Sequence, residues 1–378
     1  MHIYNRLIIG GGASGLMFAA NLEDKENIAI VEANSKLGAK ILISGGGRCN
    51  FTNKIINSSY YLANKSFIKG LLKEYSSKKI YNYFTSKGLE SSLKNDKEYF
   101  CKNSAKELLD ILLKDIKGVE LKLNTNVLSV EKKDNIFKIE TNNGALYAKS
   151  VVVASGGLSF SKIGASSIGY DIAKGFGHTI NTTNAALVGF TLQPNEAFFK
   201  ELSGVSIEAK IKVGKEVLNG SLLFAHKGIS GPVILNASVF WSKGNIEINF
   251  LRDFDLKSIK NSKKSISNTL PLPKRVTKSF LDKFNIEDKK ATLLTKQEYQ
   301  KLEQIQEYKF APAGTFGYSK AEVTKGGICT DEINSTTFES KLVKELYFLG
   351  EVLDVTGALG GYNFHFAFSS ALSCARHI

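Results

Sequence analysis

The chain has 378 residues, of which 43% are hydrophobic and 23% are charged. These fractions exclude a disordered or fibrous protein, and the length predicts two or three globular domains. The formal net charge of +14 suits a polyanionic partner such as RNA, although only five of the 50 basic residues are arginine and a general bias toward lysine explains the charge equally well.

The four cysteines, Cys49, Cys101, Cys329 and Cys374, lie far apart and form no CxxC pair. This spacing predicts neither a disulfide framework nor a metal site, and it favours a reducing cytoplasm as the location of the protein. The apolar stretch at 7–22 is too short and too rich in glycine to span a bilayer. We therefore expect no association with a membrane.

The N-terminal segment carries the pattern of a dinucleotide-binding unit. Arg6–Gly10 reads as a buried strand, a GxGxxG turn begins at Gly10, an apolar helix follows, and Ile28–Ala33 reads as a second strand. Glu32 ends this strand about twenty residues after Gly10, where a carboxylate accepts hydrogen bonds from a ribose. The glycines let a pyrophosphate approach the backbone at the helix N-terminus. Together these features predict nucleotide binding.

A second glycine-rich segment follows. Gly45–Gly47 is a run of three glycines, and Arg48, Cys49 and Asn50 come directly after it. Such a run brings bare backbone against a ligand, and arginine and asparagine offer hydrogen-bond donors. Taken alone, the run would read as a flexible surface loop. Its place after a nucleotide-binding unit favours a ligand-binding loop.

Two later segments also end in glycine pairs. Residues 119–157 alternate apolar and polar side chains between Asn/Gly turns, which predicts a β-meander that leads into a buried strand at Val151–Ala154. Residues 345–372 read as a strand, a loop with Gly360 and Gly361, and an apolar helix. A helix that begins at such a loop points its positive end at a ligand.

Five segments in this order resemble the BaiN/YhiN-like flavoprotein family, which is also called aminoacetone-oxidase-like: SGGGRCNFTN, ASGGLSFSKIGASSIGYDIAKGFGH, FAHKGISGPVILNAS, VTKGGICTDEINSTTFESK and GEVLDVTGALGGYNF. The resemblance implies a non-covalently bound FAD. It also implies an α/β fold of the two-dinucleotide-fold flavoprotein type. That fold has a Rossmann-like βαβ unit, a β-meander, an inserted β-barrel-like domain and a small helical subdomain.

The residues expected to bind FAD come from all of these segments. They are Gly10, Gly12, Ala13, Ser14, Gly15, Glu32, Ala33, Lys40, Ser44, Gly46, Gly47, Arg48, Cys49, Asn50, Val127, Ala154, Ser155, Gly156, Gly157, Gly350, Glu351, Gly361, Tyr362, Asn363 and Phe364. We expect Glu351 to fix a loop or to face the ribityl chain of the cofactor.

The predicted FAD domain is discontinuous and comprises 1–185 and 312–378, with a mostly helical excursion at 54–110. The inserted domain is expected at 186–311, β-rich over 186–255 and helical over 256–311. Seven basic residues and no acidic residue occur between Leu256 and Leu281. This basic patch near 257–278 is either a solvated helical face or a surface that meets a polyanion.

Two residues are candidates for proton transfer. Cys49 lies beside the glycine run, where a thiol protonates a carbon after hydride addition or fills space behind the flavin. His226, in a glycine-bounded turn of the inserted domain, is either an acid or base that faces the flavin or a histidine held in a turn. The sequence alone leaves both choices open.

The resemblance implies an FAD-dependent oxidoreductase, and relatives act on a ribosomal RNA uridine, a small amino ketone or steroid acids. No second GxGxxG occurs between 160 and 311, so NAD(P)H is expected as a transient donor of electrons. The charge favours the formation of dihydrouridine in ribosomal RNA. The alternatives are a small-molecule amine or amino-ketone oxidase that uses O₂ and an RNA-binding assembly factor with a structural FAD. The sequence does not specify the oligomeric state.

Overall fold

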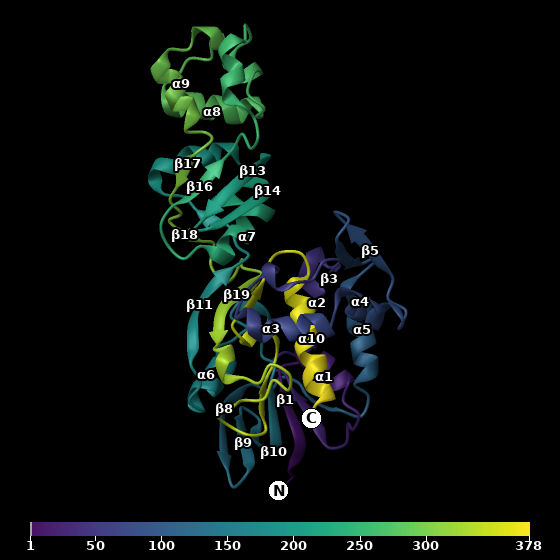
Figure 1. Cartoon of the computed structure of the whole chain (residues 1–378). Helices are drawn as coiled ribbons and strands as arrows, with labels where there is room; N and C mark the ends of the chain where they lie inside the picture. Colours follow the sequence, from purple (N-terminus) through teal and green to yellow (C-terminus); the bar gives the residue numbers. More distant parts are fainter. Residues whose placement is uncertain (1) are drawn as a thin grey trace. The chain divides into compact units, whose positions relative to one another are not determined.

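The computed structural model describes residues 2–378, which form two compact units (Figure 1). Unit 1 comprises the chain up to Asn184 together with Val323–Ile378, and unit 2 comprises Ala185–Glu322. Residues 312–322, which the sequence analysis assigns to the FAD domain, lie in unit 2. The reason is that β18 (Gly314–Thr315) pairs with β12 (Phe190–Thr191) of that unit.

Unit 1 is built on a seven-stranded mixed sheet in the order β7-β2-β1-β10-β9-β8, with β20 also paired to β10. The strands are β1 (Tyr4–Ile9), β2 (Ile28–Val31), β7 (Glu120–Lys122), β8 (Val127–Lys133), β9 (Ile136–Thr141), β10 (Gly144–Val153) and β20 (Leu346–Phe348). Parallel pairs join β1 to β2 and β10, and antiparallel pairs join β8, β9 and β10. The βαβ unit and the meander therefore share one sheet, which confirms the predicted Rossmann-like class.

Helices α1 (Ala13–Ala20) and α10 (Tyr362–Arg376) lie side by side and are buried over most of their length (Figure 1). Such apolar helices are stabilised by packing on several sides rather than by one amphipathic face. This unit also contains the helices α2 (Ala39–Ile43), α5 (Ala105–Asp115) and α6 (Ile168–Gly175). Thus the N-terminal and C-terminal segments of the chain form one core.

The segment predicted as a helical excursion contains α3 (Lys65–Glu74) and α4 (Ser77–Thr85), each with a side chain that caps its first turn. It also contains strands that the sequence analysis did not predict. These are β4 (Tyr61–Ala63), β5 (Ser91–Lys94) and β6 (Glu98–Cys101); β5 and β6 form a small antiparallel sheet with β3 (Asn50–Asn53). Strand β4 pairs instead with β21 (Val355–Gly357) near the C-terminus.

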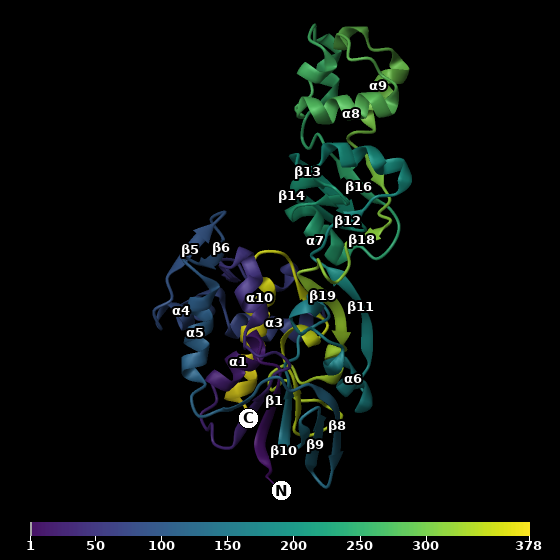
Figure 2. The same ribbon diagram turned by 180° about the vertical axis from the view of Figure 1, so that it is seen from behind.

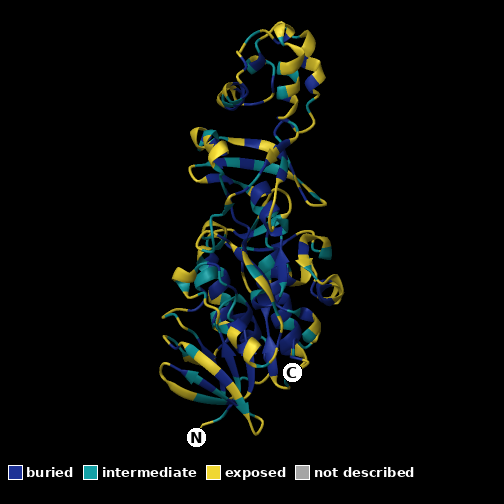
Figure 3. Ribbon diagram, turned by 90° about the vertical axis from the view of Figure 1, so that its left-hand side faces the viewer, coloured by how far each residue is buried: buried dark blue, intermediate teal, exposed yellow. Residues whose placement is uncertain are grey.

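Unit 2 contains a seven-stranded antiparallel sheet in the order β17-β16-β13-β14-β15-β12-β18. The remaining strands of this sheet are β13 (Ser206–Val213), β14 (Glu216–Ala225), β15 (Gly228–Ser230), β16 (Ile246–Asn249) and β17 (Tyr308–Phe310). Along β13 every second residue is buried and the residues between are exposed or intermediate; Figure 3 colours the ribbon by this burial. This alternation is typical of a sheet with one face on a core. A separate pair joins β11 (Ile180–Ala186) to β19 (Val323–Ile328).

The second half of unit 2 is helical, as predicted, with α8 (Lys274–Phe284) and α9 (Lys296–Glu303) next to each other (Figure 2). One face of α8 buries Val276, Phe280 and Leu281 in a core that it shares with Phe250, the residue that follows β16. Helix α7 (Pro232–Phe240) was not predicted. In the part of the chain that the structure describes, no helix is long and apolar enough to cross a membrane.

Candidate cofactor site

The first glycine turn leaves open space at the N-terminus of α1. Gly10 adopts φ 107°, and a Cβ there would lie 2.5 Å from the carbonyl oxygen of Ala154 on the adjacent strand. At Gly12 a Cβ would meet no atom within 4 Å. Among residues 2–378, the amides of Ala13 and Ser14 donate to no protein acceptor. Free amides at a helix N-terminus bind anions such as a pyrophosphate.

Glu32 is held at the end of β2 by backbone and side-chain donors. Its Oε2 accepts a hydrogen bond from the amide of Gly11 at 2.8 Å, and its Oε1 accepts from the amide and the Nδ2 of Asn34 at 2.9 and 2.7 Å. The amide of Thr125 donates to the backbone carbonyl of Glu32 at 2.9 Å, which brings the segment before Val127 next to the main chain of Glu32. A carboxylate has about four acceptor positions, so Glu32 keeps capacity for a ribose hydroxyl.

The glycine run is a defined turn. Gly45, Gly46 and Gly47 all adopt positive φ, at 56°, 67° and 84°, which side chains other than glycine rarely tolerate. A Cβ at Gly46 would meet nothing within 4 Å, so bare backbone faces open space. Arg48 is exposed, and its guanidinium carbon lies 5.8 Å from the ring centroid of Phe100. These features suit the ligand-binding interpretation of the run.

The C-terminal helix begins beside this loop. The side-chain amide of Asn50, oriented to satisfy its neighbours, accepts a hydrogen bond from the amide of Gly361 at 3.1 Å. Asn363 Oδ1 accepts from the amide of Gly357 at 2.8 Å and so shapes the turn before α10. The amides of Tyr362, Asn363 and Phe364 donate to no protein acceptor in the part of the chain that the structure describes. The positive end of α10 is therefore free to stabilise a negative charge.

Lys40 and Glu351 form an ion pair, with Nζ 2.5 Å from Oε2. Glu351 Oε1 also accepts from the amide of Thr324 at 2.9 Å, and the Thr324 hydroxyl accepts from the amide of Leu158 at 2.8 Å. Glu351 therefore fixes loops, one of the two roles expected for it. This series of hydrogen bonds connects the segments near residues 40, 158, 324 and 351. It encloses Gly157, where a Cβ would lie 2.9 Å from Glu351 Oε1.

The residues present fit a flavin dinucleotide. Two helix N-termini with free amides, a half-buried carboxylate and open glycine backbone occur in one unit, although their sources are distant in sequence. Gly350 lies against Ser14, since a Cβ at Gly350 would lie 2.1 Å from the Ser14 hydroxyl. The Thr356 hydroxyl, close to the start of α10, is buried and has no hydrogen-bond partner among the residues that the structure describes. The structure thus brings predicted binding residues of several segments together.

Cys49 lies behind the glycine run rather than on its open side. Its side chain has no exposed surface. Burial raises the pKa of the Cys49 thiol well above its usual range, and a hydrogen bond with Cys101 raises this pKa further. The thiol is fully buried by the protein itself, so a substrate carbon would not reach it. The geometry favours the space-filling role of Cys49.

His226 lies in unit 2, in the exposed turn between β14 and β15. Among residues 2–378, no hydrogen bond or ion pair of its ring is recorded. It is therefore neither buried nor held by a neighbouring side chain in that turn. Its role in proton transfer stays a prediction.

Three residues around the site were not predicted. Thr324 joins two loops as described above, and its neighbour Lys325 is buried on β19, where burial lowers the pKa of its ammonium group to about 8. His365 of α10 is fully buried. The segment VTKGGICTDE was a visible signal for Thr324 and Lys325, whereas His365 follows the start of an apolar helix and gives no signal of its own.

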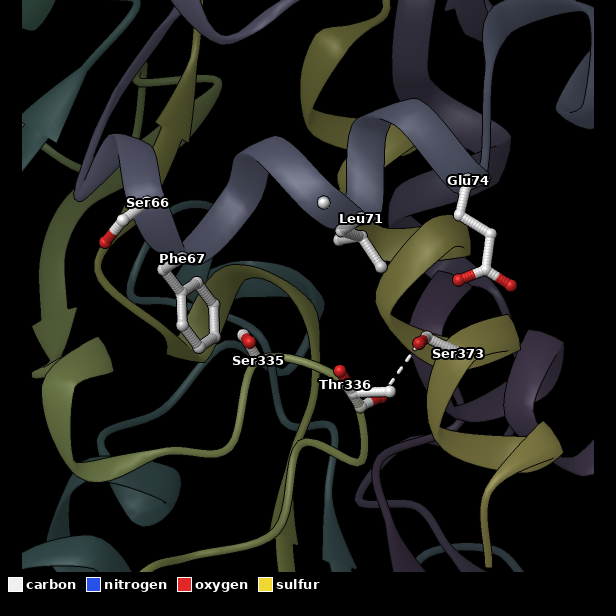
Figure 4. Close-up of a pocket in the computed structure, with 8 residues that line it drawn as sticks. Ser66, Phe67, Leu71, Glu74, Ser335, Thr336 and Ser373 are labelled. Carbon is white, nitrogen blue, oxygen red and sulfur yellow. Dashed lines mark hydrogen bonds between the residues drawn. The ribbon is translucent and has the colours of Figure 1, made fainter.

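A pocket of about 180 Å³ lies elsewhere in unit 1, between α3, the loop at 335–336 and the C-terminal half of α10 (Figure 4). Ser373 donates a hydrogen bond to the carbonyl of Thr336 at 2.8 Å on its wall. None of the residues predicted to bind the cofactor lines it. The pocket is therefore separate from the site described here.

Comparison with known proteins places this geometry in context. The family model described as the HI0933-like protein Rossmann domain matches residues 4–377. The chain is 37% identical over 395 residues to the ribosomal RNA dihydrouridine synthase of Escherichia coli (strain K12), covering 100% of this chain and 98% of that protein. It is 27% identical to the 3-dehydro-bile acid delta(4,6)-reductase of Clostridium scindens, with 98% of both chains covered.

Among solved structures, a quinol-fumarate reductase with menaquinol molecules matches with a TM-score of 0.53 and 13% identity. The match covers 100% of this chain and 71% of that protein. At this identity the likeness concerns the fold alone.

Proposed function

Because the chain belongs to the HI0933-like family and is an FAD-dependent oxidoreductase, we propose that it reduces a uridine of ribosomal RNA to dihydrouridine. The observation that carries this proposal is the 37% identity to the E. coli ribosomal RNA dihydrouridine synthase, which covers 98% of the length of that synthase. A match over the full length includes both units, so it covers the cofactor site and the inserted unit alike.

The residues of unit 1 would hold and orient the cofactor. When bound, FAD supplies the hydride for the reduction of a carbon–carbon double bond. The free amides of Ala13 and Ser14 would receive the pyrophosphate, Glu32 a ribose hydroxyl, and the free amides that begin α10 a negative charge on the flavin. NADPH or NADH would reach the site by transient docking, because residues 160–311 contain no second GxGxxG.

The helical part of unit 2 would contact RNA phosphates. All seven basic residues of the predicted patch are exposed, and none forms an ion pair among residues 2–378: Lys257, Lys260, Lys263, Lys264, Lys274, Arg275 and Lys278. Three of them lie on α8, whose opposite face is buried. Cations without carboxylate partners attract phosphates and make binding depend on salt.

A second candidate is the reduction of a small conjugated molecule. The full-length similarity to the C. scindens reductase favours it. The reduction of a small molecule does not require the exposed basic residues of unit 2, whereas binding of RNA does. The RNA substrate therefore explains a feature that the small-molecule substrate leaves unexplained. Oxidation of a small amine by O₂ has no comparable support.

The decisive experiment is a mass-spectrometric assay for dihydrouridine in ribosomal RNA from a strain that lacks this protein. We expect one dihydrouridine to disappear and to return when the protein is supplied. In parallel, the purified flavoprotein is reduced anaerobically with NADPH or NADH and offered unmodified ribosomal RNA, aminoacetone or O₂. Unchanged dihydrouridine in the strain, or fast turnover with aminoacetone and O₂, would refute the RNA proposal.

A further inference from the structure

Tyr60 is an exposed aromatic residue in the turn before β4, and it lies against the start of α10. Its ring stacks on that of Tyr362, the first residue of the helix, with centroids 4.7 Å apart and planes at 14°. Tyr362 is buried, whereas 37% of Tyr60 remains exposed. An exposed aromatic ring leaves apolar surface in contact with water. A ring that is held rigidly on a second ring is therefore suited to stack with a further planar group.

The backbone fixes Tyr60 against the loop before α10. The amide of Ala358 donates to the carbonyl of Tyr60 at 2.8 Å, and β4 pairs with β21 immediately after Tyr60. The Tyr61 hydroxyl donates to the carbonyl of Tyr362 at 3.0 Å. Tyr60 is therefore positioned by the same loop that leads into α10, whose free amides would face the cofactor.

Two exposed lysines, Lys54 and Lys97, belong to segments that contact this loop. Asn53 Nδ2 donates to the carbonyl of Gly360 at 2.9 Å, and the amide of Lys54 donates to the carbonyl of Lys97 at 2.7 Å. Neither lysine forms an ion pair in the described part of the chain. Glu98 also lies at this loop, since its carboxylate oxygen would lie 3.1 Å from a Cβ at Gly360. Asp96 and Glu98 flank Lys97 in the chain, so the two exposed lysines supply cations at this loop without giving it a net positive charge.

We propose that Tyr60, backed by Tyr362, is the platform on which a pyrimidine base of a single-stranded RNA segment stacks, and that Lys54 and Lys97 contact the adjoining phosphates. This inference rests on the proposed function and identifies the part of unit 1 that receives the substrate. A base stacks on an aromatic side chain only after it has left its own helix, and a rigid two-ring stack holds such a base without base-specific hydrogen bonds. The platform lies beside the end of α10 whose free amides would face the cofactor.

The test measures binding of a fluorescent single-stranded oligouridylate to the FAD-loaded protein by anisotropy. Tyr60→Ala should weaken binding about tenfold, whereas Tyr60→Phe, which keeps the ring, should stay within about twofold. Leu62→Ala is the matched control, because Leu62 is 39% exposed and lies two residues away on β4. It should bind as the unchanged protein does. The Lys54→Gln and Lys97→Gln variants should each lower the slope of log affinity against log salt by about 0.7.

The FAD content of each variant, read from its absorbance, separates a substrate platform from a support for the cofactor. Loss of FAD from Tyr60→Ala would overturn the inference, because Tyr60 would then act by holding Tyr362. Unchanged oligouridylate affinity in Tyr60→Ala would also overturn it. If the unchanged protein restores dihydrouridine to ribosomal RNA in the deletion strain, such a failure concerns the platform alone. If it does not, the proposed function itself fails.

Discussion

Lys40 and Glu351 are 311 residues apart in the chain, yet Lys40 Nζ donates to Glu351 Oε2 at 2.5 Å. Both residues were expected to contact the cofactor, and the structure shows that they contact each other. The pair links α2 to the short 3-10 turn at Gly350–Val352, and Thr324 extends the link to β19. The N-terminal and C-terminal segments of the site therefore depend on each other for position.

Removal of the lysine tests this dependence. In Lys40→Met the partly buried carboxylate of Glu351 loses its cation, and we expect the FAD dissociation constant to rise about fivefold, a free-energy change of about 1 kcal/mol. Because the two side chains act together, Lys40→Met combined with Glu351→Gln should cost about as much as either change alone. Titration of the apoprotein with FAD, followed by flavin fluorescence, measures all three values. Losses that add in the double variant would show that each residue acts separately.

The variant Cys49→Ala distinguishes the two roles considered for Cys49, proton donor and space-filling residue. Since the side chain is fully buried, we expect the variant to lose about 1–2 kcal/mol of unfolding free energy and to keep product formation within about threefold. A general acid typically contributes about 10²–10⁴-fold, so its loss would be unmistakable. Cys101→Ala is the matched control, because Cys101 is equally buried and contacts Cys49. A loss of about a hundredfold in Cys49→Ala alone, with FAD still bound, would restore the catalytic role.

Elements with a strong local pattern could be predicted from the sequence. The strand expected at Arg6–Gly10 is β1, and the segment KRVTKSFLDKF is α8, because one face of that helix is apolar and the other is charged. Helix α7 escaped prediction because its residues are apolar on nearly every side, a pattern that does not distinguish a short buried helix from a buried strand. Its neighbours in the sheet of unit 2 determine its conformation.

The parts of the site that depend on tertiary contacts could not be predicted. The glycines and Glu32 were found because a dinucleotide requires them at fixed spacing. The hydrogen bond between Thr52 and His365 joins residues 313 positions apart. Thr52 lies in the segment SGGGRCNFTN and His365 directly follows GEVLDVTGALGGYNF, but neither segment shows that the two side chains meet. The roles of Cys49 and Glu351 likewise depend on burial and partners, which sequence spacing does not reveal.

His178, Ser340 and Glu332 form a partly buried series of hydrogen bonds that should stabilise unit 1. Ser340 Oγ lies 2.7 Å from His178 Nε2, and His178 Nδ1 lies 3.0 Å from Glu332 Oε2. The Ser340 oxygen also accepts from the amides of Leu342 and Val343, so its proton is directed at the histidine and it has no free lone pair for nucleophilic attack.

We expect Ser340→Ala to lower the free energy of unfolding by about 1–3 kcal/mol, because it leaves buried donors and an acceptor unpaired. The control is Ser335→Ala, an exposed serine nearby, which should change it by less than about 0.5 kcal/mol. A double-mutant cycle of Ser340→Ala with Glu332→Gln, measured by urea unfolding, should give a coupling of about 0.5–3 kcal/mol. A coupling of zero would mean that the histidine does not connect the two residues.

His365 should make the stability of the protein sensitive to acid. Its Nε2 donates to the carbonyl of Tyr75 and its Nδ1 accepts from the Thr52 hydroxyl, both at 2.8 Å. Burial lowers the pKa of its imidazole from 6.5 to about 4. Between these values the unfolded chain binds a proton that the folded protein does not, so stability is complete above about pH 6.5 and falls as the pH drops toward 4.

The loss from this one group between about pH 7 and pH 5 is expected to be about 2 kcal/mol. Urea unfolding of the apoprotein at both pH values measures the total change, and His365→Gln, which keeps one donor and one acceptor, removes the part due to the imidazole. The variant should therefore be less stable at neutral pH but should lose less stability on acidification. If both proteins lose the same amount, the imidazole is not held neutral by its burial against α4 and β3, and the depressed pKa is wrong.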